Sequence, residues 1–390
     1  MSDGDTRFVS LPTIARQWGR IGVTGFGGPP AHITLLRKLC VEDEAWLSAK
    51  EFEDGIAATN LLPGPASTQL AIFCAWRLRG VPGAILGGLC FIVPGLVLIL
   101  ALSVLFLAAH PPRWVEGAAA GAGAAVPAVA LGASLGLVPA SWRRASATRA
   151  KRLRWFVFVL LGAVSAATIG PYLVLVLLAC GLAEAAAEHM RDGYAGQTGA
   201  AVLPVATVPV IAGGLAALVW VAFKVGALSY GGGFVIVPLM QHDAVNTYHW
   251  MTGAQFLNAV ALGQITPGPV VQTVAVVGYA AAGIGGGLLA AAIAFAPSFV
   301  FVIAGGPHFD RLRRSAVAQS FLTGAGAAAI GAIAGVSIPL TLALSHLWQL
   351  GALGSALVWL LVFRRGVVPA LIGSGMLGVI AVLAGAPVSH

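Results

Sequence analysis

Charged side chains are scarce in this 390-residue chain: they make up 9% of it, whereas hydrophobic residues make up 58%. The mean hydropathy of +0.90 is far above that of a soluble domain. A chain with so little charge lacks the polar surface that a water-soluble protein needs. A soluble fold is therefore excluded, and the protein is expected to reside in a lipid bilayer.

Cysteine is also rare, and its four residues are scattered, with no CxxC pair and no Cys/His cluster; they are Cys40, Cys74, Cys90 and Cys180. Neither a disulfide framework nor a metal site is indicated, so the cysteines are interpreted as small packing residues. The sequence also lacks a GxxxxGK[ST] loop, a dinucleotide fingerprint and a hydrolase-like set of Ser, His and Asp. No cofactor, direct ATP drive or enzymatic activity is therefore expected.

Long apolar runs, in contrast, are abundant. Runs long enough to cross about 30 Å of hydrocarbon occur near 83–109, 117–138, 155–187, 204–223, 285–305, 321–344, 346–363 and 367–386. The run at 155–187 contains Gly170-Pro171 and is predicted to form two short spans. The N-terminus carries Asp3 and Asp5 and no apolar core of a signal peptide, so the first helix is expected to be retained.

The net charge of +8 comes mainly from basic residues in short loops between the spans. This pattern indicates topology determinants under the positive-inside rule and not a nucleic-acid-binding surface. Three clusters are therefore predicted to be cytoplasmic: Arg143, Arg144, Arg149, Lys151, Arg152 and Arg154; Arg311, Arg313 and Arg314; and Arg364 and Arg365.

The chain contains an internal duplication at a constant offset of 204 positions. Between residues 20 and 65 this offset gives gapless identities at Gly22, Gly27, Gly28, Leu35, Val41, Trp46, Phe52, Ala57, Pro63, Gly64 and Pro65. The loop at 110–114 and its counterpart at 308–314 fall on opposite sides of the membrane in the predicted topology, which favours inverted repeats. We expect an N-terminal transporter repeat at 8–140, a basic linker with an extra helical pair at 141–203, and a C-terminal repeat at 204–386. Ser48/Glu51 and Thr252/Gln255 are capping-box patterns that begin a helix in each repeat.

Helix-breaking motifs recur inside both repeats, as a Gly-rich segment and then a Pro-Gly-Pro segment. Broken helices free backbone groups that need partners within a membrane, and helix N-termini favour anions. The predicted fold is thus an all-α polytopic membrane protein of two homologous, inverted repeats, with discontinuous helices that meet near one midplane site. The alternative is that Pro-Gly-Pro only kinks a helix for packing. The spaced glycine pairs Gly117/Gly121, Gly132/Gly136 and Gly331/Gly335 are expected to serve only close helix packing.

Each repeat also places one cation before its Gly-rich break, Arg20 and Lys224. Two cations from opposite halves could neutralise a divalent anion, although Arg20 also fits an interfacial anchor. The candidate substrate-binding residues are Arg20, Gly25, Phe26, Gly27, Gly28, Asn60, Pro63, Gly64, Pro65, Ser67, Thr68, Gln69, Lys224, Ser229, Tyr230, Gly231, Gly232, Gln264, Pro267, Gly268, Pro269, Gln272 and Thr273.

Acidic residues break the symmetry, since Glu51 and Asp54 align with Gln255 and Asn258. Glu51 and Asp54 share a helix face and are candidates for proton coupling, Asp54 being the better one because Glu51 also fits a solvated first turn. His32 and His242 are expected to be interfacial residues and not proton relays.

These motifs resemble those of a known family, the chromate ion transporters. The resemblance rests on GFGGPPAHI at 25–33, LPGPASTQL at 62–70, YGGG at 230–233 and TPGPV at 266–270, and it covers nearly the whole chain. It implies a two-domain protein of the bacterial plasma membrane that exports chromate from the cytoplasm and confers chromate resistance. The alternatives are a transporter or exchanger of sulfate, a near-isostere of chromate, or an anion channel. Membrane lipid surrounds such a protein, and a homodimer is left open.

Overall fold

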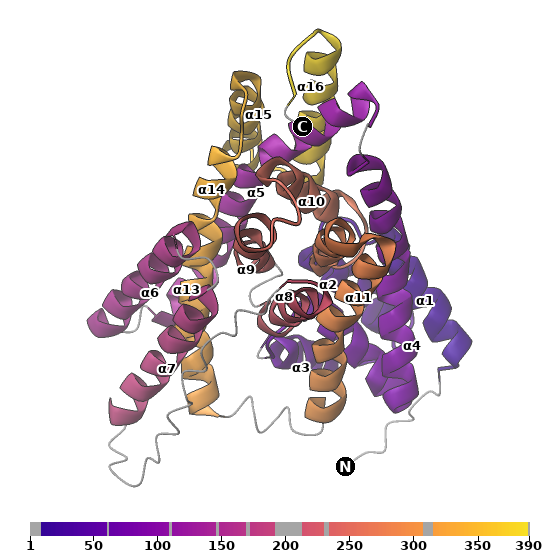
Figure 1. The fold of residues 1–390 in the computed structure, drawn as a ribbon. Helices are drawn as coiled ribbons and strands as arrows, with labels where there is room; N and C mark the ends of the chain where they lie inside the picture. Colours follow the sequence, from indigo (N-terminus) through magenta and orange to yellow (C-terminus); the bar gives the residue numbers. More distant parts are fainter. Residues whose placement is uncertain are drawn as a thin grey trace, which may run out of the picture.

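The computed structural model describes residues 9–60, 62–108, 111–145, 148–168, 172–191, 213–229, 234–306 and 315–388. In these ranges the chain is helical and has no strands (Figure 1). The helices that are long and apolar enough to cross a membrane are Ala66–Phe106, Arg113–Ala145, Leu173–Met190, Val270–Gly305 and Ala316–Leu342. The predicted all-α polytopic fold is confirmed.

The first repeat and the helical pair that follows it form eight consecutive elements. These are α1 (Leu11–Thr24), α2 (Pro29–Arg37), the π-helical η1 (Lys38–Asp43), α3 (Ala49–Thr59), α4 (Ala66–Phe106), α5 (Arg113–Ala145), α6 (Arg149–Thr168) and α7 (Leu173–Arg191). The run at 155–187 is divided between the separate helices α6 and α7, and α7 is the one of the two that is long and apolar enough to cross a membrane.

The second repeat has the same order of main helices, with additional short elements. It contains α8 (Leu215–Leu228), α9 (Ile236–His242), the π-helical η3 (Asp243–Thr247), α10 (Gly253–Ile265), the 3-10 turn η4 (Val270–Gln272), α11 (Thr273–Gly305), α13 (Ala316–Gly335), α14 (Ser337–Leu342), α15 (Leu347–Leu357), the π-helical η6 (Val358–Val362) and α16 (Val367–Leu383). α8 starts and ends 204 positions after α1, and a π-helical turn follows α2 and α9 alike. The structure therefore contains the duplication that the sequence predicts.

Both predicted capping boxes are present. The Ser48 hydroxyl accepts the backbone N–H of Glu51, whose carboxylate accepts the backbone N–H of Ser48, and Thr252 and Gln255 exchange the same two bonds. This reciprocal capping satisfies N–H groups that the first helical turn leaves free. It fixes the start of α3 and of α10, the helices that lead into the Pro-Gly-Pro segments.

The apolar runs of the sequence coincide with the long helices, but some of these helices begin earlier than the runs predict. The predicted span at 83–109 belongs to α4, which begins at Ala66 and has a second break at Arg79–Gly80, where Gly80 has φ 58°. α11 has the matching break at Ala282–Gly283, with φ 63° at the glycine. Only glycine adopts this left-handed backbone without strain. Residues 204–212 of the predicted span at 204–223 lie outside the described ranges.

The two halves exchange helices. α6 and α7 pack against α13 of the second half, whereas α15 and α16 pack against α5 of the first half, as Figure 1 shows at its left and its top. In the centre, α1 packs on α4, α8 packs on α11, and α4 packs on α11 across the pseudo-symmetry. Each half therefore completes the other half's outer layer.

Glycine allows two of these contacts to be close. A Cβ at Gly331 would lie 1.9 Å from the backbone oxygen of Val159, and one at Gly378 would lie 2.0 Å from that of Gly117. The packing predicted for Gly331/Gly335 and Gly117/Gly121 is therefore confirmed. It is wrong for Gly132/Gly136, because nothing lies within 4 Å of a Cβ at Gly136.

The packing of the broken helices is not symmetric. In the second half, α10 packs along α5 and α16, and α9 contacts α13 and α7. In the first half, the equivalent α2 and α3 make no comparable packing with α5, α13 or α16 in the described ranges, and α3 packs mainly on α4. The first half thus has an opening beside its Gly-rich break.

We predict that Gly331→Ala destabilises the protein by about 1–3 kcal/mol, because the new methyl group must push α13 away from α6. Gly136→Ala is the matched control. It lies in open space and is expected to be neutral or to stabilise by up to about 1 kcal/mol through helix propensity. Thermal unfolding in detergent measures both. Equal effects of the two substitutions would contradict close packing of α13 on α6.

Candidate functional site

The first break separates α1 from α2 at Gly25–Gly28. Gly27 and Gly28 have φ values of 98° and 73°, which side-chain-bearing residues rarely adopt. Gly25 has an ordinary φ, but a Cβ there would lie 2.8 Å from the His32 ring. Gly27 and Gly28 are thus required for their backbone conformation, and Gly25 is required because a side chain there would collide with His32. The matching Tyr230, Gly231 and Gly232 lie outside the described residues.

The second break of each half is the Pro-Gly-Pro segment. Its central residues, Gly64 and Gly268, have φ values of 120° and 94°. Helix resumes at Ala66 in the first half and at Val270 in the second. The amide groups of the first turn have no carbonyl partner within the helix, so each segment presents N–H donors at a new helix start.

The breaks of opposite halves meet. The backbone N–H of Gly268 donates to the carbonyl oxygen of Gly25 over 3.0 Å. On the pseudo-symmetric side, a Cβ at Gly64 would lie 3.4 Å from the carbonyl oxygen of Gly226, which precedes Ser229. We call this region the break junction: Gly25–Gly28, Pro63–Gln69, Gly226–Ser229 and Pro267–Gln272.

His32 is part of the break junction. Its side chain is fully buried, with Nε2 2.9 Å from the carbonyl oxygen of Gly25 and Nδ1 3.3 Å from Ser67 Oγ. Since a carbonyl only accepts, Nε2 donates, and in the neutral ring Nδ1 accepts from the Ser67 hydroxyl. The expectation of an interfacial His32 is wrong. The seven-residue spacing between Gly25 and His32 could have indicated this contact, because the first turn of α2 brings the imidazole ring back to the Gly-rich break.

Several buried polar atoms in and beside the break junction have no hydrogen-bond partner within the described chain. Those from the predicted site are Thr68 Oγ1, Gln69 Oε1, Ser229 Oγ, Gln264 Nε2 and Gln272 Oε1. The amide nitrogens of the other two glutamines donate to the carbonyl oxygens of Pro63 and Ile92. A buried polar group without a partner costs about 1–3 kcal/mol. These atoms are therefore positioned to contact a polar ligand.

Lys224 is buried at 3% exposure and forms an ion pair with Asp243, the first residue of η3, which is 5% exposed. The sequence patterns did not indicate Asp243, although a buried lysine in an apolar segment requires a counter-charge. Arg20, its equivalent, lies exposed on α1. The two cations thus have different surroundings, and the charge of Lys224 is already compensated.

The remaining predicted residues differ in exposure. Asn60 is exposed at the end of α3, Phe26 is 47% exposed, and Pro267, Pro269 and Thr273 are buried in the second half. Pro65 caps α4 without a side-chain bond.

The two acidic candidates lie on α3, outside the candidate membrane spans. The backbone N–H of Ser48, together with Arg77 at 2.5 Å and the Ser48 hydroxyl, holds the pKa of Glu51 below its usual value. Glu51 therefore stays ionised at neutral pH, which favours a structural role. Asp54 is half-buried.

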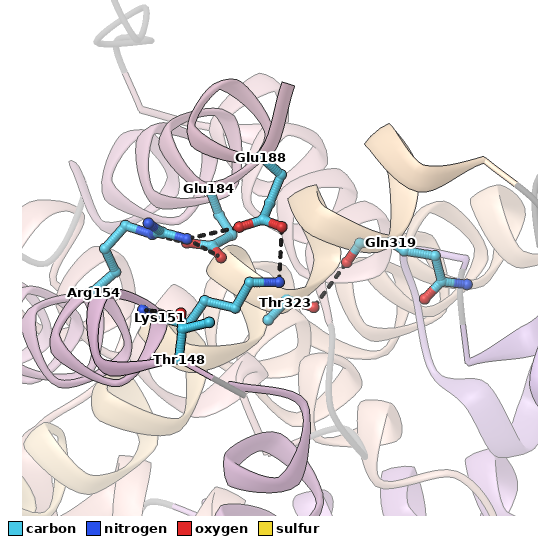
Figure 2. Close-up of polar contacts among 7 residues, drawn as sticks. All are labelled: Thr148, Lys151, Arg154, Glu184, Glu188, Gln319 and Thr323. Atoms are coloured by element: carbon cyan, nitrogen blue, oxygen red, sulfur yellow. Dashed lines mark hydrogen bonds and ion pairs between the residues drawn. The ribbon is translucent and has the colours of Figure 1, made fainter. Parts of the chain in front are cut away.

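Part of the first basic cluster is neutralised. Arg154 of α6 pairs with Glu184 and Glu188 of α7, and Lys151 pairs with Glu188 over 2.7 Å, as Figure 2 shows. These pairs hold α6 to α7 beside α13. The two cations are therefore not available to attract an anion.

A cavity of about 310 Å³ adjoins the break junction on the side where α2 lacks packing. Gly27, Gly28 and Gln264 line it, together with α5 and the turn before α16. A second cavity, of about 190 Å³, lies farther along α5 and α10 and is lined by Glu116, Gln255 and Asn258 among others. No group of His, Cys, Asp and Glu in the described residues could hold a metal ion.

These features define a multi-pass membrane protein built from two repeats of discontinuous helices that meet at a buried polar junction. A family model described as chromate transporter matches residues 12–185 and 216–380. The chain belongs to the chromate transporter family. Each matched region contains the same succession of helices, and the first includes α6 and α7, which the sequence analysis assigned to a linker.

Curated relatives share most of this length. A chromate transport protein of Cupriavidus metallidurans is 33% identical over 85% of this chain and 82% of its own, and one of Pseudomonas aeruginosa is 27% identical over 85% and 81%. An uncharacterized transporter of Methanocaldococcus jannaschii is 26% identical over 89% and 88%. No solved structure matches the chain. The protein is therefore a multi-pass protein of the cell membrane.

We predict that Asp243→Asn lowers the free energy of unfolding by about 3–5 kcal/mol, because it leaves the Lys224 ammonium buried without a counter-charge. The double substitution Lys224→Met with Asp243→Leu should recover most of that loss. Glu51→Gln is the control: its pair with Arg77 is exposed, the capping bond is kept, and a loss below about 1 kcal/mol is expected. Thermal unfolding in detergent measures all three. A double variant as unstable as Asp243→Asn would contradict a simple ion pair.

Proposed function

We propose that this protein exports chromate from the cytoplasm and thereby confers chromate resistance, with the break junction as its substrate site. The observation that carries the proposal is that three buried groups able to donate, the hydroxyls of Thr68 and Ser229 and the amide nitrogen of Gln264, have no partner in the described chain, which belongs to the chromate transporter family. The proposed site comprises the residues predicted from the sequence except Arg20, with His32 added.

The chemistry of the junction suits a tetrahedral oxyanion. Such a dianion has four acceptor oxygens and no donor, and Ser229, Thr68, Gln264 and the first amides of the Pro-Gly-Pro helices supply donors. The buried ion pair of Lys224 adds no net charge. We therefore assign binding mainly to neutral donors, and we assign Arg20 to the membrane interface.

The sidedness of the opening supports loading from the cytoplasm. The cavity beside Gly27 and Gly28 extends to Arg364 and Arg365, which the positive-inside rule places on the cytoplasmic side. The packed α9–α10 and the unpacked α2–α3 are the two arrangements expected of inverted repeats caught in one state of alternating access. We infer that this state is open to the cytoplasm.

Membrane voltage can drive export. A dianion leaving a negative-inside cell gains about 4.6 kcal/mol per 100 mV, since each charge contributes about 2.3 kcal/mol. That free energy sustains a gradient above about a thousandfold. Proton coupling is then unnecessary for export, and Asp54 remains the candidate if coupling exists.

We predict that proteoliposomes of the purified protein release internal chromate in a saturable manner, and that an inside-negative potential accelerates this release. Absorbance of external chromate measures the flux. Sulfate at equal concentration tests selectivity: equal transport of both ions would identify a general oxyanion transporter, and non-saturable flux would identify a channel. No specific flux of either ion would contradict transport by this chain.

We further predict that chromate release persists at constant voltage when the pH gradient is collapsed, because voltage alone suffices. Asp54→Asn should then leave the flux unchanged. Its matched control is Asn258→Asp, which places a carboxylate at the equivalent position of the second half. A pH-dependent component that Asp54→Asn removes and Asn258→Asp does not would instead assign proton coupling to Asp54.

A further inference from the structure

The cavity beside the first break is lined from three directions. The Gly-rich break contributes Gly27–Pro30, α5 contributes residues 129, 132 and 133, and the η6–α16 turn contributes Leu360, Leu361, Arg364 and Arg365. Gln264 of α10, Phe234, and Val367 and Val368 of α16 also line it. No acidic side chain is among its lining residues in the described chain.

The turn before α16 fixes the position of the two arginines. The backbone N–H of Phe363 donates to Val358 and that of Arg365 to Trp359, while the Trp359 indole N–H donates to the carbonyl oxygen of Gly366. Arg364 adopts a left-handed φ of 52°. This conformation is uncommon for a residue with a side chain and persists where neighbouring bonds impose it.

The two arginines carry uncompensated charge. Within the described residues, Lys151, Arg154, Arg37, Arg77 and Lys224 all have carboxylate partners, whereas Arg364 and Arg365 have none. An arginine guanidinium is always ionised and binds planar or tetrahedral oxyanions through paired N–H donors. The lining of the cavity therefore includes two positive charges, each on a group that can bind an oxyanion.

Gln264 provides the independent sign of a ligand. Its side chain is 7% exposed, it lines the cavity, and its Nε2 has no hydrogen-bond partner in the described chain. A buried N–H donor without a partner is costly, and a ligand with acceptor oxygens would satisfy it. Gln264 also lies three residues before the Pro-Gly-Pro segment, and it lines the same cavity as the two arginines and as Gly27 and Gly28 of the break junction.

We propose that this cavity is a loading site for a divalent tetrahedral oxyanion. Arg364 and Arg365 capture the ion at the cytoplasmic mouth, and the Gln264 amide replaces part of its water shell before it enters the break junction. The inference rests on the proposed function, and it gives these arginines a role beyond setting the membrane topology. The phosphate of an anionic lipid has the same chemistry, so the test separates the two sources.

The test measures chromate and sulfate binding to the full-length protein in nanodiscs of zwitterionic lipid by equilibrium dialysis. Arg364→Gln with Arg365→Gln should weaken binding about tenfold or more, since hydrogen bonds to charged groups are lost, and should reduce its salt dependence. Gln264→Leu should weaken binding about tenfold. Arg364→Lys with Arg365→Lys keeps both charges and should retain part of the affinity.

The matched control is Arg144→Gln with Arg149→Gln. It removes the same charge from another cytoplasmic loop without touching the cavity, and binding should change less than about twofold. Elution volume and melting temperature confirm that each variant is folded. Equal weakening in the control and in the Arg364/Arg365 variant would overturn the proposal, because it would reduce the effect to general surface charge.

Two further outcomes also decide the question. Unchanged binding in the Arg364/Arg365 variant, with a wild type that transports chromate, overturns the loading site and leaves the proposed function standing. A wild type that neither binds nor transports chromate or sulfate contradicts the proposed function itself. Nanodiscs with a small fraction of anionic lipid complete the test: binding that persists in them supports an oxyanion site, and binding that disappears identifies a lipid site.

Discussion

The carbonyl oxygen of Gly25 connects the two halves of this protein. It accepts the backbone N–H of Gly268 from the second half and the Nε2–H of His32 from the first. Each break frees backbone groups that lipid cannot satisfy. Here the Pro-Gly-Pro break of the second half supplies an N–H donor to the free carbonyl of the Gly-rich break in the first half. Neither repeat therefore satisfies its broken backbone alone. The outer layer shows the same mutual dependence of the halves, because α6 and α7 pack on the second half and α15 and α16 pack on the first.

The two repeats have the same order of helices, but equivalent helices differ in their charged residues and in their packing. α10 is held along α5 by buried apolar residues, whereas α3 carries Glu51, Glu53 and Asp54 and packs mainly on α4. Charged side chains favour water over a dry helix interface. The acidic residues of α3 thus explain why α3 lacks the packing on α5 and α16 that α10 has. A duplicated sequence produces unequal packing once its polar residues diverge.

The sequence predicted the helical class, the duplication, both capping boxes and the location of the breaks, because glycine, proline and caps act locally. It did not predict the breaks at Gly80 and Gly283, since a glycine inside an apolar helix is equally consistent with close helix packing and with a break. It also missed Asp243 and the burial of His32. Both depend on which helix faces which, and that information resides in long-range contacts that local patterns do not contain.

The distribution of charge along the proposed path has a physical consequence. A substrate held by two free guanidinium groups throughout its path would bind tightly and leave slowly, and transport requires weak and successive binding. Here the uncompensated cations, Arg364 and Arg365, lie at the mouth, whereas Lys224 near the break junction is neutralised by Asp243. The path therefore begins with attraction by charge and continues among neutral donors. In the proposed mechanism, neutral donors at the junction bind the dianion weakly enough for release, and the membrane voltage sets the direction of its movement.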